Sequence, residues 1–218
     1  MIQIPGILGE IVEKRLVTIE EAKKKKSLSE VRTIAENSNA PLSLQRTIAS
    51  KSGISLIAEM KRSSPSAGSM DPNLDPANRA TLYCDAGAGA ISVLTEPDYF
   101  SGSIDDLAAV SVIARVARVP VLRKDFIVDE YQVYEARAAG ADCILLIIAC
   151  LDPSQYADLF NLSTSMGMDV LVEVFDEPEL DIGLSAVEPN VVGINNRNLK
   201  TLETSLEVFE NLAKKIPD

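Results

Sequence analysis

The sequence of 218 residues contains no histidine. This absence excludes nucleophile systems of the Ser-His-Asp and Cys-His types. It also excludes zinc and iron sites that are built on histidine ligands. Any acid–base chemistry in this protein must therefore use Asp, Glu, Lys, Tyr or Cys.

Cysteines, long apolar runs and positive charge are scarce as well. Cys84, Cys143 and Cys150 show no CxxC spacing and lie in apolar segments, which predicts free thiols in a reducing, cytoplasmic compartment. No apolar run approaches the ~20 residues that span a bilayer, and the N-terminus lacks the pattern of a secretory signal. The formal net charge of −11 opposes non-specific binding to nucleic acid. We therefore expect neither a nucleic-acid nor a membrane partner, and no pattern predicts an oligomeric state.

From about residue 54 onward, short β-rich apolar runs alternate with helical patterns. The predicted strands are 55–61, 90–95, 119–125, 142–149, 169–175 and 191–197, and the predicted helices are 76–86, 104–118, 130–139, 153–166, 178–185 and 205–215. The pairs Asp75-Pro76 and Asp152-Pro153 are typical of an N-cap followed by proline at the first helical position. Repeated strand–helix units imply a parallel sheet, either doubly wound or closed into a (β/α)8 barrel.

Residues 1–53 differ from the rest of the chain. An amphipathic helical pattern over 7–26 ends in four lysines, Lys23 to Lys26, and a second helical pattern covers 28–36. The lysine run favours a solvated helix end over an anion site. We interpret 1–53 as a helical extension packed on the α/β region of residues 54–218, and not as a separate domain.

Charged and amide side chains stand at or near the C-terminal ends of several predicted strands. They are Glu59, Lys61, Lys124, Glu173, Asn195 and Arg197. In a parallel α/β fold these strand ends meet at one rim, which is where active sites lie. A single charged strand end is usually a solvated terminus or a structural ion pair, but the repetition over separate strands predicts a functional site. Such a cluster would be costly to bury for structure alone.

The charges of this cluster indicate the class of its ligand. Lys61, Lys124 and Arg197 outnumber Glu59 and Glu173 by one, so a net charge of +1 favours an anionic small molecule. Lysine has an unperturbed pKa of about 10.4 and is a poor acid at neutral pH. We expect neighbouring cations to lower the pKa of Lys124, which would suit proton transfer around a carbonyl. A Schiff base on lysine is the alternative.

Five motifs carry a resemblance to a known family. The segments IAEMKRSSPSAG, VLTEPDYFSGS, VPVLRKDFIVDEYQVYEARAAGADCILLI, LVEVFDE and VVGINNRNLKTLE occur in the order in which similar segments occur in indole-3-glycerol-phosphate synthases. The resemblance implies a (β/α)8 TIM barrel and a decarboxylating lyase of tryptophan biosynthesis. The implied substrate is a phosphorylated anion, 1-(2-carboxyphenylamino)-1-deoxyribulose 5-phosphate, which loses CO2 and water to give indole-3-glycerol phosphate. No metal or organic cofactor is implied.

By their positions in these motifs, the resemblance implies catalytic roles for Lys124, Glu173, Lys61, Glu59 and Asn195. Lys124 is similar to the general acid that protonates the ketone oxygen of the substrate. Lys61 is similar to the lysine that holds the anionic groups and protonates the departing hydroxyl. Glu173 is similar to the carboxylate that acts in dehydration, with Glu59 as its electrostatic partner.

The resemblance also implies substrate-binding positions. Asn195 and Arg197 are similar to the residues that orient the dehydration carboxylate and the substrate. Ser64, Phe100 and Phe126 are similar to pocket-lining residues, and the two rings are expected to pack against the anthranilate group. For Phe100, ordinary packing within its loop is an almost equal alternative.

The sequence departs from the family pattern at its end, because it stops at KKIPD with six strand–helix units. Strands seven and eight, whose loops commonly bind phosphate in such barrels, have no counterpart in it. We therefore expect a fragment of a longer product, nearly inactive and poorly soluble by itself. The alternatives are a truncated barrel that only binds a ligand or partner, and another phosphate-handling barrel such as phosphoribosylanthranilate isomerase. The latter gives no reason for the Glu-x-Lys, Lys-Asp-Phe and Asn-x-Arg motifs.

Overall fold

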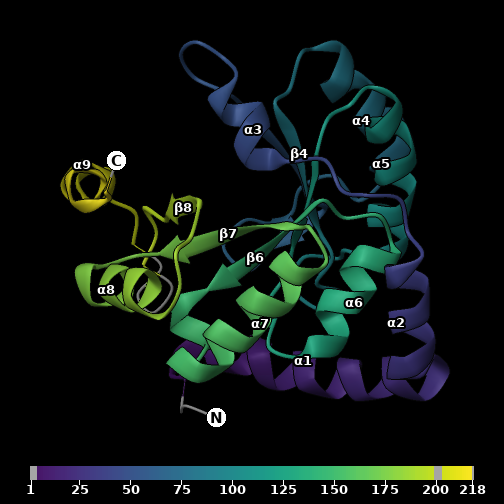
Figure 1. The fold of residues 1–218 in the computed structure, drawn as a ribbon, viewed down its shortest axis with the longest axis horizontal. Coiled ribbons are helices and arrows are strands. Elements are labelled where there is room, and N and C mark those ends of the chain that lie inside the picture. The colour runs from purple at the N-terminus through teal and green to yellow at the C-terminus, as the bar shows by residue number, and fades with distance from the viewer. Residues whose placement is uncertain (1–3, 199–202, 218) are drawn as a thin grey trace.

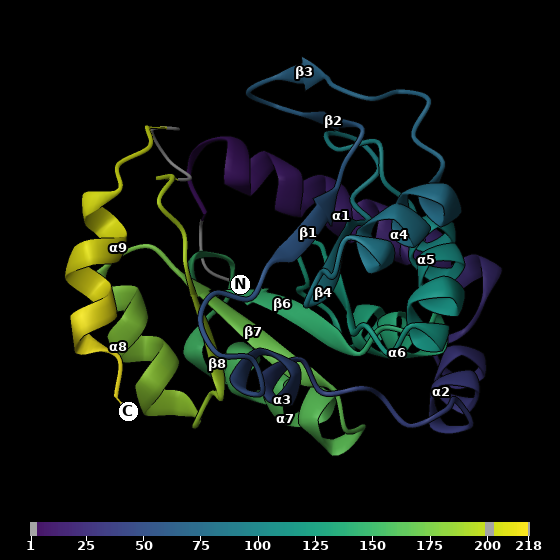
Figure 2. The same cartoon turned by 90° about the horizontal axis from the view of Figure 1, so that it is seen from above.

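The computed structural model of the chain describes residues 4–198 and 203–217. Its main sheet contains six parallel strands: β1 (Ile57–Met60), β4 (Ala90–Leu94), β5 (Val121–Lys124), β6 (Cys143–Ile147), β7 (Asp169–Val174) and β8 (Val191–Ile194). The strands are paired in the order β1-β4-β5-β6-β7-β8, so each strand lies beside its successor in the chain. Each one falls within a range predicted from the sequence. The sheet curls like part of a barrel (Figures 1 and 2).

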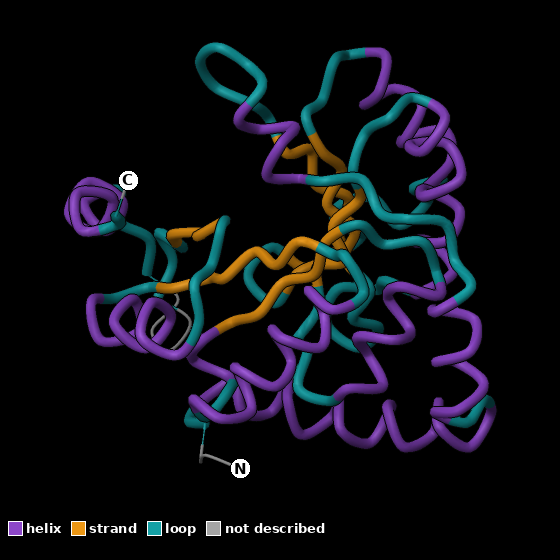
Figure 3. The backbone as a smooth tube through the Cα atoms, in the orientation of Figure 1, coloured by secondary structure: helices purple, strands orange, loops and turns teal. Residues whose placement is uncertain are grey.

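A helix follows each strand of the main sheet. These helices are α4 (Pro76–Asp85), α5 (Ile104–Val116), α6 (Glu130–Ala138), α7 (Pro153–Ser165), α8 (Glu177–Ala186) and α9 (Glu207–Leu212). Short 3-10 turns cover Ile148–Cys150 (η1) and Ala213–Lys215 (η2). The carboxylates of Asp75 and Asp152 accept hydrogen bonds from the first turns of α4 and α7, which confirms the predicted caps. The helices lie around the outside of the curled sheet (Figure 3).

Burial of the strands follows their position in the sheet. Every residue of β4 and β6 is buried, as expected for central parallel strands that are covered on both faces. The residues of β8, at one edge of the sheet, are only half-buried. The hydrophobic core therefore lies around the middle strands, and the described sheet has β1 and β8 at its two edges.

Two small elements were not predicted. Within the loop after β1, β2 (Ser63–Ser64) and β3 (Gly68–Ser69) form an antiparallel hairpin, so the described residues include eight strands in all. Between the N-terminal helices and β1 lies α3 (Leu44–Ala49). Both elements are too short to show a hydrophobic period, which is why the sequence did not reveal them. Gly68, with a φ of +65°, permits the tight turn of the hairpin.

The N-terminal helices are α1 (Gly6–Lys25) and α2 (Leu28–Glu36), in agreement with the predicted helical patterns. Both pack against α6, and α1 runs across the bottom of the molecule in Figure 1. The lysine run is mixed in character, because Lys23 forms ion pairs of 2.9 Å with Asp129 and Glu20 while the three lysines after it are exposed.

Two further expectations concern the cysteines and membranes. All three cysteines are free thiols; Cys143 and Cys150 are buried, and Cys84 is half-buried. In the part of the chain that the structure describes, every helix is too short or too polar to traverse a bilayer. Residues 199–202, which belong to the last of the five motifs, lie outside the described residues.

Candidate active site

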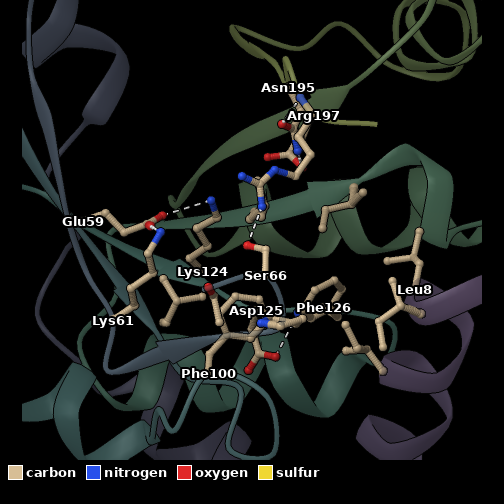
Figure 4. A pocket seen from close by; sticks show the side chains of 18 of the residues that line it. Leu8, Glu59, Lys61, Ser66, Phe100, Lys124, Asp125, Phe126, Asn195 and Arg197 are labelled. Atoms are coloured by element: carbon tan, nitrogen blue, oxygen red, sulfur yellow. Dashed lines mark hydrogen bonds and ion pairs between the residues drawn. The ribbon is translucent and has the colours of Figure 1, made fainter. Parts of the chain in front are cut away.

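One cavity of about 430 Å³ opens at the C-terminal ends of the strands. It is lined by every residue that the sequence analysis singled out: Glu59, Lys61, Ser64, Phe100, Lys124, Phe126, Glu173, Asn195 and Arg197. These residues come from four strand ends and two loops and span 139 positions of the chain from the first to the last, 59 to 197. The rim predicted at the C-terminal ends of the strands is therefore a single cavity (Figure 4).

Glu59 connects the two lysines of the site. Its Oε1 lies 2.6 Å from Nζ of Lys61, and its Oε2 lies 3.0 Å from Nζ of Lys124. The two lysines approach this carboxylate from β5 and from the residue after β1 (Figure 4). All three side chains are between 28% and 34% exposed, so the cluster is open to a ligand.

The pKa values of this cluster differ from what the sequence analysis expected. Burial tends to lower the pKa of Lys124, but the charges of Glu59 and Glu173 outweigh it and hold that pKa above its ordinary value. The expected lowering of this pKa by neighbouring cations is therefore wrong, because the carboxylates have the larger effect. Burial tends to raise the pKa of Glu59, but Lys124 and Lys61 lower it overall. Lys124 and Glu59 are therefore both charged at neutral pH.

A second group of polar residues lies at the ends of β7 and β8. The amide nitrogen Nδ2 of Asn195 donates to Oε1 of Glu173 at 3.0 Å, and this bond fixes the carboxylate at the end of β7. The backbone N–H of Arg197 donates to Oδ1 of Asn195 at 2.9 Å. Nη1 of Arg197 donates to Oγ of Ser66 at 2.7 Å, so the last strand contacts the loop after the first one (Figure 4).

Aromatic side chains form part of the cavity wall. The ring centroids of Phe100 and Phe126 lie 6.1 Å apart with an interplanar angle of 39°, a tilted arrangement typical of packed rings. Ser64 also lines the cavity, and its Oγ accepts a hydrogen bond from the backbone N–H of Ala67 within the loop. Phe100 therefore faces the cavity and packs within the site at the same time.

Several lining residues were missed by sequence reasoning. Ile7, Leu8 and Ile11 of α1 line the cavity, so the N-terminal helix contributes a wall as well as covering the core. Their apolar spacing predicted only a buried face of a helix. Apolar residues of the central strands, such as Leu145, line the cavity too.

Asp125 is the most informative residue that was missed. It lines the cavity, which brings the lining charges to three cations and three carboxylates rather than the predicted excess of one cation. Nη2 of Arg15 and Nη2 of Arg123 lie 2.8 and 3.0 Å from its Oδ2. Because these two guanidinium groups neutralise Asp125 without lining the cavity, the groups that face a ligand still favour an anion.

Glu96 fixes the loop that carries Phe100. This carboxylate is completely buried and accepts hydrogen bonds from the backbone N–H groups of Asp98, Tyr99 and Phe100 at 2.7 to 3.1 Å. Burial raises the pKa of Glu96 above its ordinary value in spite of these donors. A carboxylate followed by a polar loop could have been recognised in the motif TEPDYF as an internal cap.

Comparisons with known proteins find relatives over most of the chain. The family model described as indole-3-glycerol phosphate synthase matches residues 8–218. A protein of that name from Rhodospirillum rubrum is 46% identical over 216 residues, which are 97% of this chain and 80% of that protein. One from Bordetella pertussis is 51% identical over 77% of this chain and 62% of that protein. One from Mycolicibacterium gilvum is 47% identical over 88% of this chain and 68% of that protein.

The chain thus covers between 62% and 80% of the lengths of these relatives. The matched residues include every member of the cavity cluster from Glu59 to Arg197. The resemblance seen in the five motifs extends over nearly the whole chain, at identities far above those of chance similarity. The chain therefore belongs to the indole-3-glycerol phosphate synthase family, whose members are carboxy-lyases of tryptophan biosynthesis.

Proposed function

We propose that this cavity converts 1-(2-carboxyphenylamino)-1-deoxyribulose 5-phosphate to indole-3-glycerol phosphate, CO2 and water, with Lys124 as the general acid. The observation that carries the proposal is the position of Lys124. Its Nζ lies 3.0 Å from Glu59, and its charge is stabilised by Glu173 across the same cavity. A cationic amine between two carboxylates, facing an open volume, is a group with a proton to deliver.

In the first step, Lys124 protonates the ketone oxygen of the substrate. The carbonyl carbon becomes electrophilic, and the aromatic carbon that bears the carboxylate attacks it, which forms the new carbon–carbon bond. The carboxylate then leaves as CO2, and the electrons of the broken bond restore the aromatic ring. Lys124 carries its proton at neutral pH, because its pKa lies above an ordinary value that is already about 10.4.

In the second step, the hydroxyl formed from the ketone leaves as water. Lys61 protonates this hydroxyl, and Glu173 accepts a proton from the adjacent ring carbon, so that the double bond of the indole forms as water leaves. The hydrogen bond from Asn195 to Glu173 fixes this carboxylate near the end of β7, while Lys61 stands directly after β1. Because different residues deliver and remove the two protons, neither group has to move across the substrate.

Binding of the substrate follows from the lining of the cavity. Phe100 and Phe126 offer ring faces to the anthranilate group, and Ser64 lies beside them in the first loop. Lys61 and Arg197 supply positive charge for the carboxylate and phosphate. Glu59 holds both lysines close to each other before the substrate arrives.

The test is the replacement of the proposed acid. We expect Lys124→Met to lower kcat by about 10² to 10⁴-fold, the range for loss of a general acid, while the protein stays folded. Steady-state kinetics followed by the fluorescence of the indole product measure this. Complementation of a tryptophan auxotroph provides the second readout, with growth lost in the variant.

Lys51→Met is the matched control, because Lys51 is exposed and its Nζ donates to the backbone oxygen of Gly87, far from the cavity lining. This variant should keep kcat within about twofold, as expected for a surface change. Turnover that survives Lys124→Met would contradict the assignment of the acid. Isomerase activity on phosphoribosylanthranilate in place of ring closure would contradict the proposed function.

A further inference from the structure

Arg15 of α1 reaches into the protein beneath the cavity. It is 6% exposed, and its Nη2 donates to Oδ2 of Asp125 at 2.8 Å, although the two residues are 110 positions apart. Nη1 of Arg15 donates to Oγ1 of Thr18 on the same helix. A long side chain of the N-terminal helix is thus anchored at the end of β5, next to the proposed acid.

Asp125 is held from four directions. Besides Arg15, its Oδ2 accepts from Nη2 of Arg123 at 3.0 Å and from Oγ1 of Thr95 at 2.6 Å. Its Oδ1 accepts from the backbone N–H of Phe126 at 2.8 Å. The side chain of Asp125 is completely buried, so these contacts are shielded from solvent. The carboxylate therefore sets the path of the backbone where β5 ends.

The neighbours of Asp125 in the chain both belong to the site. Lys124 immediately precedes it and Phe126 immediately follows it, and both line the cavity. A change in the position of the Asp125 carboxylate moves the backbone that carries these two side chains. Displacement of a reacting group by 1 Å can cost ~100-fold in rate. The position of Lys124 thus depends on what holds Asp125.

Arg15 and Arg123 hold Asp125 in different ways. Arg123 also forms an ion pair of 2.8 Å with Glu135 and donates to the backbone oxygen of Gln132, so it has partners besides Asp125. Within the described residues, Arg15 forms an ion pair with Asp125 alone. Its Nε is buried with no hydrogen-bond partner in the described structure, an unfavourable arrangement that the contact to Asp125 offsets.

We propose that Arg15 is a positioning residue for the ring closure: through Asp125 it holds Lys124 and Phe126 in place. This inference rests on the proposed function, since it assigns to Arg15 the placement of the proposed acid. It gives the N-terminal helix a role in the rate of the reaction as well as in covering the core.

The experiment compares Arg15→Met and Arg15→Lys with the control Arg32→Met. Arg32 lies on α2 and pairs with Glu36 at 2.7 Å, but both side chains are more than half exposed. We expect Arg15→Met to lower kcat by roughly 10- to 100-fold and to change KM by less than about threefold. Arg15→Lys keeps a cation near Asp125 and should recover most of kcat. Arg32→Met should resemble the unsubstituted protein.

A second readout does not require turnover. Hydrogen exchange of the Phe126 amide, measured by NMR, should become at least tenfold faster in Arg15→Met than in Arg32→Met, because the acceptor Asp125 loses its anchor. Arg15→Lys should fall between them. If Arg15→Met does not fold, the comparison of Arg15→Lys with the unsubstituted protein decides the question by both readouts.

Unchanged kcat in a folded Arg15→Met protein would overturn the inference, and so would unchanged exchange at Phe126. Equal losses of kcat in Arg15→Met and Arg15→Lys with no change in exchange would also contradict it, because this pattern indicates general destabilisation. Absence of turnover in the unsubstituted protein, assayed at the full length of its curated relatives, contradicts the proposed function instead. In that case the exchange of Phe126 still shows whether Arg15 sets the end of β5.

Discussion

Two clusters of charged side chains meet at the end of β5, and they are built differently. In the cavity, Glu59 is shared by Lys61 and Lys124, and all three side chains are more than a quarter exposed. Beneath the cavity, Asp125 is shared by Arg15 and Arg123, and these side chains are at most 7% exposed. Each cluster places two cations around one carboxylate, so their chemistry is nearly the same.

The surroundings of the two carboxylates separate them. Asp125 also accepts hydrogen bonds from Thr95 and from the backbone of Phe126, so both of its oxygens have neutral or cationic donors. The carboxylate of Glu59 forms ion pairs with the two lysines, and these lysines face the open cavity. The buried cluster uses arginine, whose planar group suits fixed contacts, and the open cluster uses lysine, which can give up a proton.

The comparison teaches how a structural and a reactive ion cluster can be told apart. Buried charges must be fully paired, because the loss of one partner leaves an uncompensated charge. Partly exposed pairs contribute little to stability, because water already solvates them. The cluster around Asp125 should therefore affect the stability of the fold and, through the position of Lys124, turnover as well, whereas the cluster in the cavity should affect turnover with little effect on stability.

The largest effect is expected from a matched pair of carboxylate-to-amide changes. Asp125→Asn leaves the buried Arg15 and Arg123 without their shared anion and should lower the free energy of unfolding by about 3–5 kcal/mol. Glu173→Gln replaces a cavity carboxylate that is hydrogen-bonded to Asn195. This substitution should change the free energy of unfolding by less than about 1 kcal/mol. Urea unfolding followed by circular dichroism measures both values.

The same two variants should show the reverse order in their loss of kcat, with the larger loss in Glu173→Gln. Glu173→Gln keeps the fold and removes the proposed proton acceptor, so its kcat should fall by about 10² to 10⁴-fold. A Glu173→Gln protein as unstable as Asp125→Asn would remove the distinction between the carboxylates of the cavity and the buried carboxylate beneath it.

The fold could be predicted from the sequence where elements are long and well punctuated. The apolar run at 142–149 and the Asp-Pro pairs mark β6 and the starts of α4 and α7 unambiguously. The hairpin at Ser63–Ser69 and helix α3 could not be predicted, since each has too few residues for a periodic pattern. Their formation depends on contacts with other parts of the chain.

The site could be predicted in part for a similar reason. Lys124 and Glu173 stand at or near the C-terminal ends of predicted strands, and the meeting of such ends in a parallel sheet placed them at one rim. Asp125 follows Lys124 directly, but no local pattern singled it out. Its partner Arg15 lies 110 residues earlier, and no local pattern connects them. The pairing of distant charges was therefore the information that the sequence did not supply.

A smaller effect is expected from acid. Burial tends to raise the pKa of Asp125, but Arg15 and Arg123 lower it overall, so the folded-state pKa lies below the unfolded value of about 3.9. Its contribution to stability is thus complete above the unfolded pKa and is lost as the pH falls through the folded pKa. The difference in unfolding free energy between the unsubstituted protein and Asp125→Asn should be constant above about pH 5 and should shrink in acid.

This difference in unfolding free energy isolates Asp125 from carboxyl groups whose pKa shifts in the opposite direction on folding. Burial raises the pKa of Glu96, so its protonation favours the folded state as the pH falls, but it does so equally in both proteins. Urea unfolding from pH 3 to pH 7 provides the measurement. A difference that stays the same throughout this range would show that Arg15 and Arg123 do not hold Asp125 in its charged form.

The smallest effect on stability, and the sharpest test of the open cluster, comes from Glu59→Gln. Because the charge of Glu59 is the largest influence that raises the pKa of Lys124, its removal should lower that pKa, and burial should then contribute more. The free energy of unfolding should change by less than about 1 kcal/mol, since the pair is partly exposed. Titration of the lysine side chains by NMR, with Lys124→Met to assign the signal, measures the shift. A Lys124 pKa that does not fall in Glu59→Gln would mean that Glu59 does not control the proposed acid, and the open cluster would then need another source for the charge on Lys124.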